Sequence, residues 1–200
     1  MSRQTQSANA VPSHDVLVAR DASYANDSLF TGDTLFPSNL PSEAQQRVYV
    51  LDVHIIDGPI DPDFLNNNPI ISRRIEMLGI HTLADLHQAI FRAFDRQAQH
   101  LYEFQIGGKG PQDPNNRIYG LPEALRREED ETAAGDVEAT TLATAGIAVD
   151  QPFGYWFDFG DDWWHQVNLV NIRVDHHPES FPRVVGRIGA SPPQRQTDEA

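Results

Sequence analysis

The chain has 200 residues, and 40% of them are hydrophobic, which is enough for one globular domain with a core of its own. Its 29 acidic and 15 basic residues leave a formal net charge of -14, so the average field of the protein repels the phosphates of nucleic acids and disfavours a general DNA-binding role. The sequence contains no cysteine, which excludes disulfides, thiolate metal ligands and cysteine nucleophiles.

Residues 1–46 are rich in Ser, Asn, Asp and Pro, with apolar residues too scattered to build a core. We interpret them as a largely disordered arm, in which the pairs Leu29-Phe30 and Leu35-Phe36 are candidate anchors for the domain or for a partner. No apolar signal-peptide core follows the polar start, and no apolar run approaches the roughly 20 residues of a membrane span. These features predict a soluble, cytoplasmic protein that does not bind membranes.

Alternating apolar and polar residues predict a half-buried strand over residues 48–56. Its buried face would carry Tyr49, Leu51, Val53 and Ile55. After a segment rich in Pro, Asp and Asn, residues 70–78 predict a second strand that contains Arg73 and Arg74. Adjacent residues of a strand face opposite ways, so at most one of these arginines can point at any given site.

The main helix is predicted to start after Thr82, an N-cap residue that Asp85 completes as an acidic variant of the capping box. The apolar face of this helix would comprise Leu83, Leu86, His87, Ile90 and Phe94. The face in water would comprise Asp85, Gln88, Arg92 and Arg96. A histidine on an apolar stripe is more often a structural residue bonded to backbone than a binding residue, and both interpretations of His87 stay open.

Further along the chain, residues 101–106 predict a strand that ends at a pair of glycines. The stretch 109–122 is rich in turn residues, and the acidic stretch 128–138 favours a solvated loop. A brief helical turn is expected over 140–145 and an edge strand over 181–188, with a loose tail over 194–200.

The most informative segment is Asp158-Phe159-Gly160-Asp161-Asp162-Trp163-Trp164-His165, which groups carboxylates, indoles and an imidazole around one glycine. Apolar residues alternate with a period of two on both sides of it, which predicts a hairpin with a polar tip. If its loop is Gly160-Asp161, then Asp158 lies opposite Trp163, while His165 lies opposite Trp156 and diagonal to Asp158.

The candidate catalytic or metal-binding residues are Asp158, Asp161, His165 and His100. Carboxylates and imidazoles suit zinc, manganese or iron, and a bound metal can activate water, so a metal-dependent hydrolase is one hypothesis. In the competing interpretation the aspartates bond nearby backbone amides and Gly160 supplies a positive φ, as in many turns. Polar turns far outnumber metal sites, so no cofactor is assigned and a divalent metal stays an alternative.

The aromatic residues of this hairpin are Tyr155, Trp156, Phe157, Trp163 and Trp164. Core packing explains them better than a continuous stacking platform, because alternation sends Tyr155 and Phe157 to one face and Trp156 to the other. An exposed indole among them would still be a good anchor for a partner. The candidate ligand-binding or partner-binding residues are Trp163, Trp164, His87 and Arg74.

Three motifs occur in a fixed order: Thr82-Leu83-Ala84-Asp85-Leu86-His87, then His100-Leu101-Tyr102-Glu103-Phe104, then Asp158-Phe159-Gly160-Asp161-x-Trp163-x-His165. In these motifs the chain resembles the plasmid-encoded Orf3-like family, whose members are often labelled insertion-sequence passenger proteins. The resemblance covers roughly residues 47–193. It implies a compact α+β domain with a mostly antiparallel sheet, one main helix and few short helices, in agreement with the elements above.

The resemblance implies no firm reaction. This chain carries Ser72 where the family tends to have tryptophan, Ser191 where it has cysteine and Gln194 where it has glutamate, so no metal role is expected for the tail. The label of insertion-sequence passenger protein also associates the family with resolvases, which are DNA recombinases. Recombinase activity is disfavoured for this chain. A recombinase needs clustered arginines around a scissile phosphate, whereas this acidic chain offers only the pairs Arg73-Arg74 and Arg126-Arg127.

The leading hypothesis is a binding or interaction module, encoded with mobile or accessory genes, that recognises a protein partner. Its functional face would be the acidic-aromatic hairpin and the adjoining helix. The alternatives are the metal-dependent hydrolase and a purely structural role for the hairpin residues.

Overall fold

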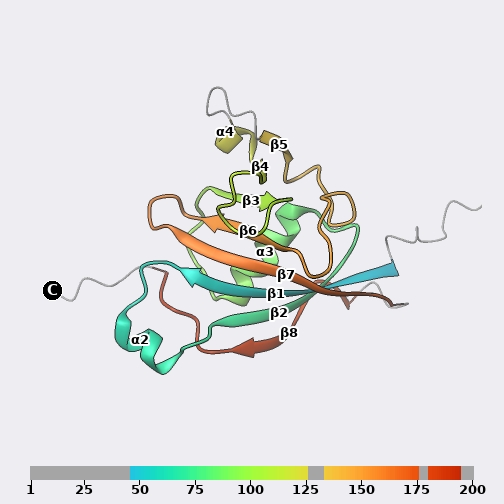
Figure 1. Cartoon of the computed structure of the whole chain (residues 1–200). Helices are drawn as coiled ribbons and strands as arrows, with labels where there is room; N and C mark the ends of the chain where they lie inside the picture. Colours follow the sequence, from blue (N-terminus) through green and yellow to red (C-terminus); the bar gives the residue numbers. More distant parts are fainter. Residues whose placement is uncertain (1–45, 126–132, 176–179, 195–200) are drawn as a thin grey trace, which may run out of the picture. The chain divides into compact units, whose positions relative to one another are not determined.

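The computed structural model in Figure 1 describes residues 46–125, 133–175 and 180–194. The chain divides into two units, Met1–Ser38 and Asn39–Ala200, and every described residue belongs to the second. The predicted arm of residues 1–46 therefore lies outside the described residues except for Gln46, and the predicted tail does so except for Gln194.

One mixed sheet of eight strands organises the described part of the chain, in the order β5-β4-β3-β6-β7-β1-β2-β8. The strands are β1 (Arg47–Asp57), β2 (Ser72–Leu78), β3 (Tyr102–Ile106), β4 (Arg117–Gly120), β5 (Ala133–Asp136), β6 (Pro152–Phe157), β7 (Trp163–Val174) and β8 (Arg183–Ile188). Every neighbouring pair is antiparallel except β4 and β5, which are parallel. The predicted α+β fold with a mostly antiparallel sheet is confirmed.

The described helices are α2 (Pro62–Asn67), α3 (Leu83–Ala93) and α4 (Pro122–Leu125), so α3 is the one main helix. Thr82 caps α3 as predicted: its Oγ1 accepts from Asp85 N at 3.1 Å, and Asp85 Oδ2 accepts from Thr82 N at 2.9 Å. This capping box satisfies two backbone amides that a helix start otherwise leaves without partners. None of the helices in these described ranges is long and apolar enough to cross a membrane.

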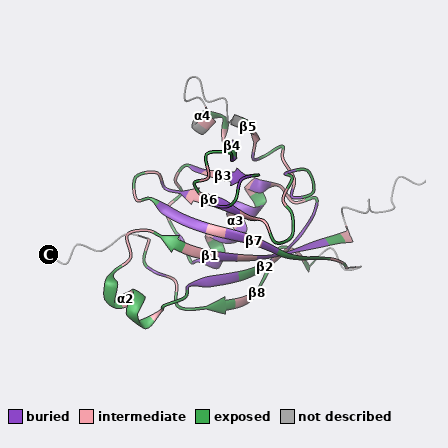
Figure 2. Cartoon of the chain, viewed as in Figure 1, coloured by how far each residue is buried: buried purple, intermediate pink, exposed green. Residues whose placement is uncertain are grey.

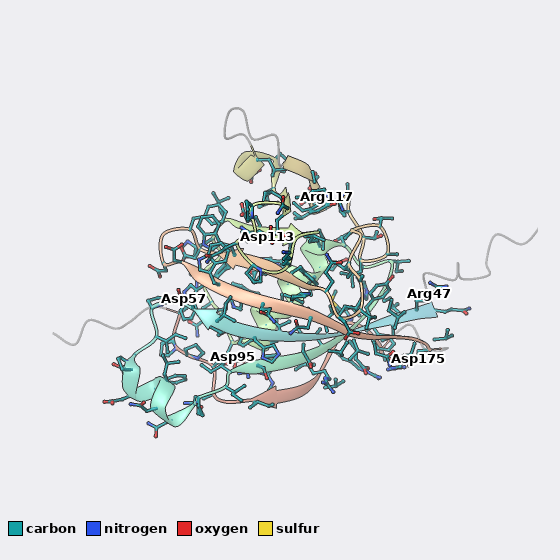
Figure 3. The ribbon with its side chains drawn as sticks, in the orientation of Figure 1. Arg47, Asp57, Asp95, Asp113, Arg117 and Asp175 are labelled. Atoms are coloured by element: carbon teal, nitrogen blue, oxygen red, sulfur yellow. The ribbon has the colours of Figure 1, made fainter. Side chains whose placement is uncertain are left out.

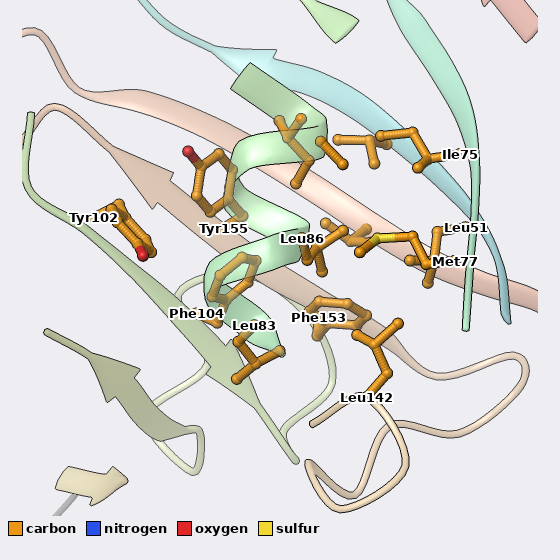
Figure 4. Packing of buried hydrophobic residues seen from close by; sticks show 14 of the residues in the cluster. Leu51, Ile75, Met77, Leu83, Leu86, Tyr102, Phe104, Leu142, Phe153 and Tyr155 are labelled. Carbon is orange, nitrogen blue, oxygen red and sulfur yellow. The ribbon is translucent and has the colours of Figure 1, made fainter. Parts of the chain in front are cut away.

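The core lies between α3 and one face of the sheet, where Leu83 and Leu86 of the helix meet aromatic and aliphatic side chains of the strands (Figure 4). Burial follows the central strands, whereas α2 and β8 are exposed along most of their length (Figure 2). The predicted buried face of β1 is confirmed for three residues and partly for Ile55. Val48 and Val50, on its opposite face, are also buried.

Two short strands were missed. β4 lies in the stretch predicted as turns, and β5 lies in the stretch predicted as a solvated loop, where Val137 is also fully buried. Each strand has only four residues, and neither shows enough alternation to be recognised before its pairing partner is known. The rest of that predicted loop, residues 126–132, lies outside the described residues. The helical turn over 140–145 and the edge strand β8 are confirmed.

The register predicted for the hairpin was wrong by one residue. β6 and β7 pair Phe157 with Trp163, Trp156 with Trp164 and Tyr155 with His165, so the loop has five residues, 158–162. The amides of Asp161 and Asp162 both donate to Asp158 O. The left-handed conformations fall on Asp158 (φ 56°) and Asp162 (φ 55°), not on Gly160 as predicted. Aspartate tolerates this conformation because its short side chain can bond the local backbone.

Candidate functional site

The residues of the hairpin divide between the two faces of the sheet. Trp163 and His165 point into the core beside α3 and are fully buried, so Trp163 is excluded as the surface anchor proposed from the sequence. Trp164 lies on the opposite face, where its ring stacks on Trp156 with centroids 4.8 Å apart. Phe159 packs on the same indole of Trp156. The hairpin therefore does not gather its acids, rings and imidazole on one patch.

The four candidate metal ligands are only partly brought together. His100 Nε2 lies 3.4 Å from Asp158 Oδ2 but makes no hydrogen bond. His165 is enclosed in the core, where its Nδ1 lies 3.3 Å from Tyr155 O. Asp161 lies in the loop. Within the described ranges no three His, Asp or Glu residues converge on a common point, so the metal-binding set considered from the sequence is not assembled.

Arg96 was predicted to lie in water, but it is 7% exposed. The helix ends at Ala93, and Asp95, labelled in Figure 3, adopts a positive φ of 56° that redirects the chain. The guanidinium then lies 3.5 Å from the ring centroid of Trp163, and neither of its terminal nitrogens has a hydrogen-bond partner. Burial lowers the pKa of Arg96 to about 10, against the opposing effect of Tyr155 and of nearby carboxylates.

Arg73 and Arg74 point in opposite directions, as strand geometry predicted. Arg73 is buried and donates to Ala93 O at 2.8 Å and to Ser191 Oγ at 2.8 Å, so it ties the end of α3 to the C-terminal segment. Arg74 is exposed on the other face, where it forms a bidentate ion pair with Asp52. Arg74 therefore lies away from the α3 side of the sheet.

A cavity of about 690 Å³ opens between α3 and the segment that leads into β3. We call it the α3 cavity. Its lining comprises Ala84, Asp85, His87, Gln88, Gln99, His100, Leu101, Tyr102, Leu121 and Glu138. His87, proposed from the sequence as a binding or structural residue, and His100, proposed as a ligand, meet in this cavity. Its volume falls in the range of small-molecule binding pockets, about 300 to 1,000 Å³.

Buried aromatic and polar side chains support the wall of the cavity. The His87 ring stacks on Tyr102 with centroids 3.7 Å apart and an interplanar angle of 2°. Its Nε2 lies 3.2 Å from Gln99 Oε1, and its Nδ1 lies 2.7 Å from the Tyr155 hydroxyl. Burial lowers the pKa of His87 to about 4, so the ring is neutral near pH 7.

These contacts fix the tautomer of His87. A neutral imidazole carries one N–H, and the Gln99 oxygen can only accept, so Nε2 donates to it. The Tyr155 hydroxyl then donates to Nδ1. His87 is bonded to side chains, not to backbone as its structural interpretation assumed. Both ring nitrogens are occupied, so His87 acts as a rigid part of the wall.

The field in the α3 cavity is negative. Burial raises the pKa of Tyr102, and the surrounding carboxylates raise it further; they belong to Glu138, Asp136, Asp85 and Glu123. The carboxylate of Asp85 is held in place by its capping bond to Thr82 N. Neither lysine nor arginine occurs among the described lining residues. The lining therefore combines fixed negative charge with neutral acceptors.

The hairpin tip supports one wall of the cavity. Asp158 N donates to Leu101 O at 2.9 Å, next to the contact between Asp158 and His100. Sequence reasoning missed Gln88, Gln99, Leu121 and Glu138 as site residues, because they come from separate segments with no shared motif. Asp85 was identified only as a helix cap.

The comparisons with known proteins agree with this fold. The family model described as plasmid pRiA4b ORF-3-like protein matches residues 63–196. The chain is 28% identical over 129 residues to the uncharacterized protein y4hQ of Sinorhizobium fredii (strain NBRC 101917 / NGR234), a match that covers 63% of this chain and 59% of that relative. A crystal structure of MM3350, a protein of unknown function from Methanosarcina mazei Go1, is similar with a TM-score of 0.53 and 25% identity, covering 71% of this chain and 70% of that one.

Neither name assigns an activity to the relative that bears it. The family match spans well over half of the chain and includes the α3 motif, both histidines of the cavity and the hairpin. The chain therefore belongs to the plasmid pRiA4b ORF-3-like protein family.

Proposed function

We propose that this protein is a binding module that recognises a protein partner at the α3 cavity. The observation that carries the proposal is the cavity itself: an opening of about 690 Å³ with a wall of interlocked, neutral, buried side chains and a polar rim. Preformed pockets of this kind bind without a large ordering cost, because their side chains are already immobilised.

The chemistry of the wall favours binding over catalysis. A general base needs a free nitrogen that can reach a substrate proton, and both nitrogens of His87 already have side-chain partners. His100 Nε2 lies 3.4 Å from Asp158 Oδ2, and no serine or threonine that a histidine could activate as a nucleophile occurs among the described lining residues. In the part of the chain that the structure describes, no metal-binding group of three residues supplies an activated water instead.

Of the predicted functional face, the adjoining helix α3 contributes to the lining of the cavity, whereas none of the hairpin residues 158–165 is among the described lining residues. The helix supplies His87 and Gln88, and the hairpin supports the opposite wall through Leu101. The binding face proposed here is therefore the surface around α3 and the segment that leads into β3. The family resemblance adds the proposal that this module is encoded with mobile or accessory genes.

The test is capture of partners by the tagged full chain, followed by measurement of the affinity of each purified partner. Gln88→Trp fills the cavity from a half-buried position on α3. Arg92→Trp is the matched control, because it adds the same ring one turn later on the same helix at an exposed position outside the lining. We expect Gln88→Trp to weaken partner binding at least about tenfold, the equivalent of about 1.4 kcal/mol, and Arg92→Trp to leave it unchanged.

A third variant tests the other face of the sheet. Trp156→Ala removes the ring that stacks on Trp164 and leaves the cavity lining intact. Loss of binding in Trp156→Ala together with full binding in Gln88→Trp would move the site to that face and contradict the proposal. Recovery of no partner by the wild-type chain would also count against it.

A further inference from the structure

We infer that the α3 cavity receives a positively charged side chain, lysine or arginine, from a basic segment of the partner protein. This inference rests on the proposed function, because it names the chemistry that the proposed binding site recognises. It is carried by the combination of an open pocket, the carboxylates of its lining and the absence of basic residues from the described lining.

The charges of the lining have one sign. Asp85 and Glu138 contribute carboxylates directly, and Asp136 and Glu123 lie close enough to act on the Tyr102 hydroxyl. Asp85 and Glu138 are exposed side chains, so each attracts a cation only modestly, and the walls of the pocket act by holding several carboxylates around one position. The same walls would make an anionic ligand unfavourable, since no charged donor of the described lining faces it.

The neutral groups of the lining suit the same ligand. Gln88 and Gln99 provide amide oxygens that can accept from an ammonium or guanidinium group. His87 is neutral and has both nitrogens occupied, so it adds no opposing positive charge. The apolar parts of Leu101 and Leu121 can contact the aliphatic stem of a long basic side chain while its charged end meets the carboxylates.

The charge of the whole chain favours the encounter with such a partner. A net charge of -14 attracts basic segments over distances comparable to the Debye length, about 10 Å at 0.1 M salt. Steering of this kind raises the association rate, whereas the local carboxylates determine where the cation stays bound. The cavity is also large enough to hold flanking backbone of the partner together with the basic side chain.

The experiment titrates the full chain with two peptides that differ at one central position. Both have Gly and Ser on either side, one with arginine and one with glutamine in the centre. Binding is followed by NMR shifts of the backbone amides of Gln88, Gln99 and His100, a readout that detects weak binding and locates it. We expect the arginine peptide to bind at least about tenfold more tightly than the glutamine peptide, and its binding to weaken as salt rises from about 0.05 to about 0.5 M.

Two variants with equal change in net charge separate a local effect from a general one. Glu138→Lys reverses a charge in the lining, at an exposed side chain for which no structural bond is present among the described contacts. Asp63→Lys reverses a charge on α2, away from the lining. We expect about a tenfold loss of arginine-peptide binding in Glu138→Lys and less than about a twofold loss in Asp63→Lys.

Equal binding of the two peptides, or equal effects of the two variants, would overturn the inference. The proposed function fails in a different way, because it requires that Gln88→Trp weakens binding of the partner whatever the charge of the ligand. If Gln88→Trp blocks the partner but the arginine peptide shows no preference, the binding site stands and its cationic ligand is wrong. If the arginine peptide binds in the cavity but Gln88→Trp leaves the partner bound, the cation preference stands and the protein-binding role is wrong.

Discussion

His165 and His87 are two histidines that the fold keeps neutral. His165 lies between the rings of Phe94 and Tyr155 and is 1% exposed. Its pKa is lowered to about 3, first by burial and then by the cation of Arg96. The pKa of His87 is lowered to about 4 by burial. Both groups would have a pKa of about 6.5 in the unfolded chain. At pH values between the folded pKa of each histidine and about 6.5, the unfolded state therefore binds more protons than the folded state.

The consequence is a loss of stability on acidification. The contribution of each neutral histidine is fully present above about pH 6.5 and is lost progressively as pH falls toward its folded pKa, about 4 for His87 and about 3 for His165. Between pH 7 and pH 5 we expect each of them to remove about 2 kcal/mol from the free energy of unfolding. Urea denaturation at the two pH values measures this loss.

The variant His165→Leu isolates one of the two contributions. Its free energy of unfolding at pH 7 falls because the side chain is reshaped, but the further loss between pH 7 and pH 5 should be smaller than in the wild type by about 2 kcal/mol. An unchanged difference between the two pH values in this variant would show that His165 is not held neutral by the fold.

The helix α3 depends on its first turn for its position in the domain. The capping box joins Thr82 to Asp85, and the next backbone contacts, Leu83 N to Thr140 O and Ala84 N to Val137 O, join the same turn to the segment after β5. One wall of the α3 cavity therefore begins at a capped helix end. Loss of the cap leaves backbone donors without partners and loosens that wall.

Thr82→Ala is expected to lower the free energy of unfolding by about 1 kcal/mol, because it removes the hydroxyl that accepts from Asp85 N. Thr82→Ser keeps this acceptor and serves as the matched control. Urea denaturation of the two variants measures the difference. Equal stability of Thr82→Ala and Thr82→Ser would mean that the capping bond contributes nothing measurable.

The C-terminal segment connects distant parts of the domain. Arg73 on β2 donates to Ser191 Oγ, and Ser191 Oγ donates to Asp95 Oδ2 at 2.6 Å. Further along, Gln194 Oε1 accepts from Gln97 N and Ala98 N, and its Nε2 donates to Ala98 O. These bonds hold the chain just before Gln99 and His100, which line the α3 cavity. The C-terminal motif therefore stabilises a cavity wall.

Gln194→Ala is expected to lower the free energy of unfolding by about 1 to 2 kcal/mol, since three hydrogen bonds are lost, two of them partly buried. It should also speed hydrogen exchange at the amides of Gln97 and Ala98, which exchange mass spectrometry or NMR can follow. Gln194→Glu keeps the acceptors but loses the donor to Ala98 O, so its effect should be intermediate. Unchanged exchange at these two amides in Gln194→Ala would contradict the supporting role.

Local patterns in the sequence determined the parts of this protein whose cause is local. The capping residues predicted α3, alternation predicted β1 and the hairpin, and three ordered motifs identified the family. Each of these features depends on residues that are close in the chain, so neighbouring side chains and backbone propensity are sufficient to specify them.

Only the tertiary structure decided where the chemistry lies. The hairpin register depended on an aspartate-containing loop of five residues, and a shift of one residue exchanges the faces of every side chain in a strand. Arg96 became buried because the chain turns at Asp95, beyond the last residue to which helical periodicity applies. The α3 cavity combines side chains from separate segments, and such convergence depends on long-range packing that no local pattern encodes.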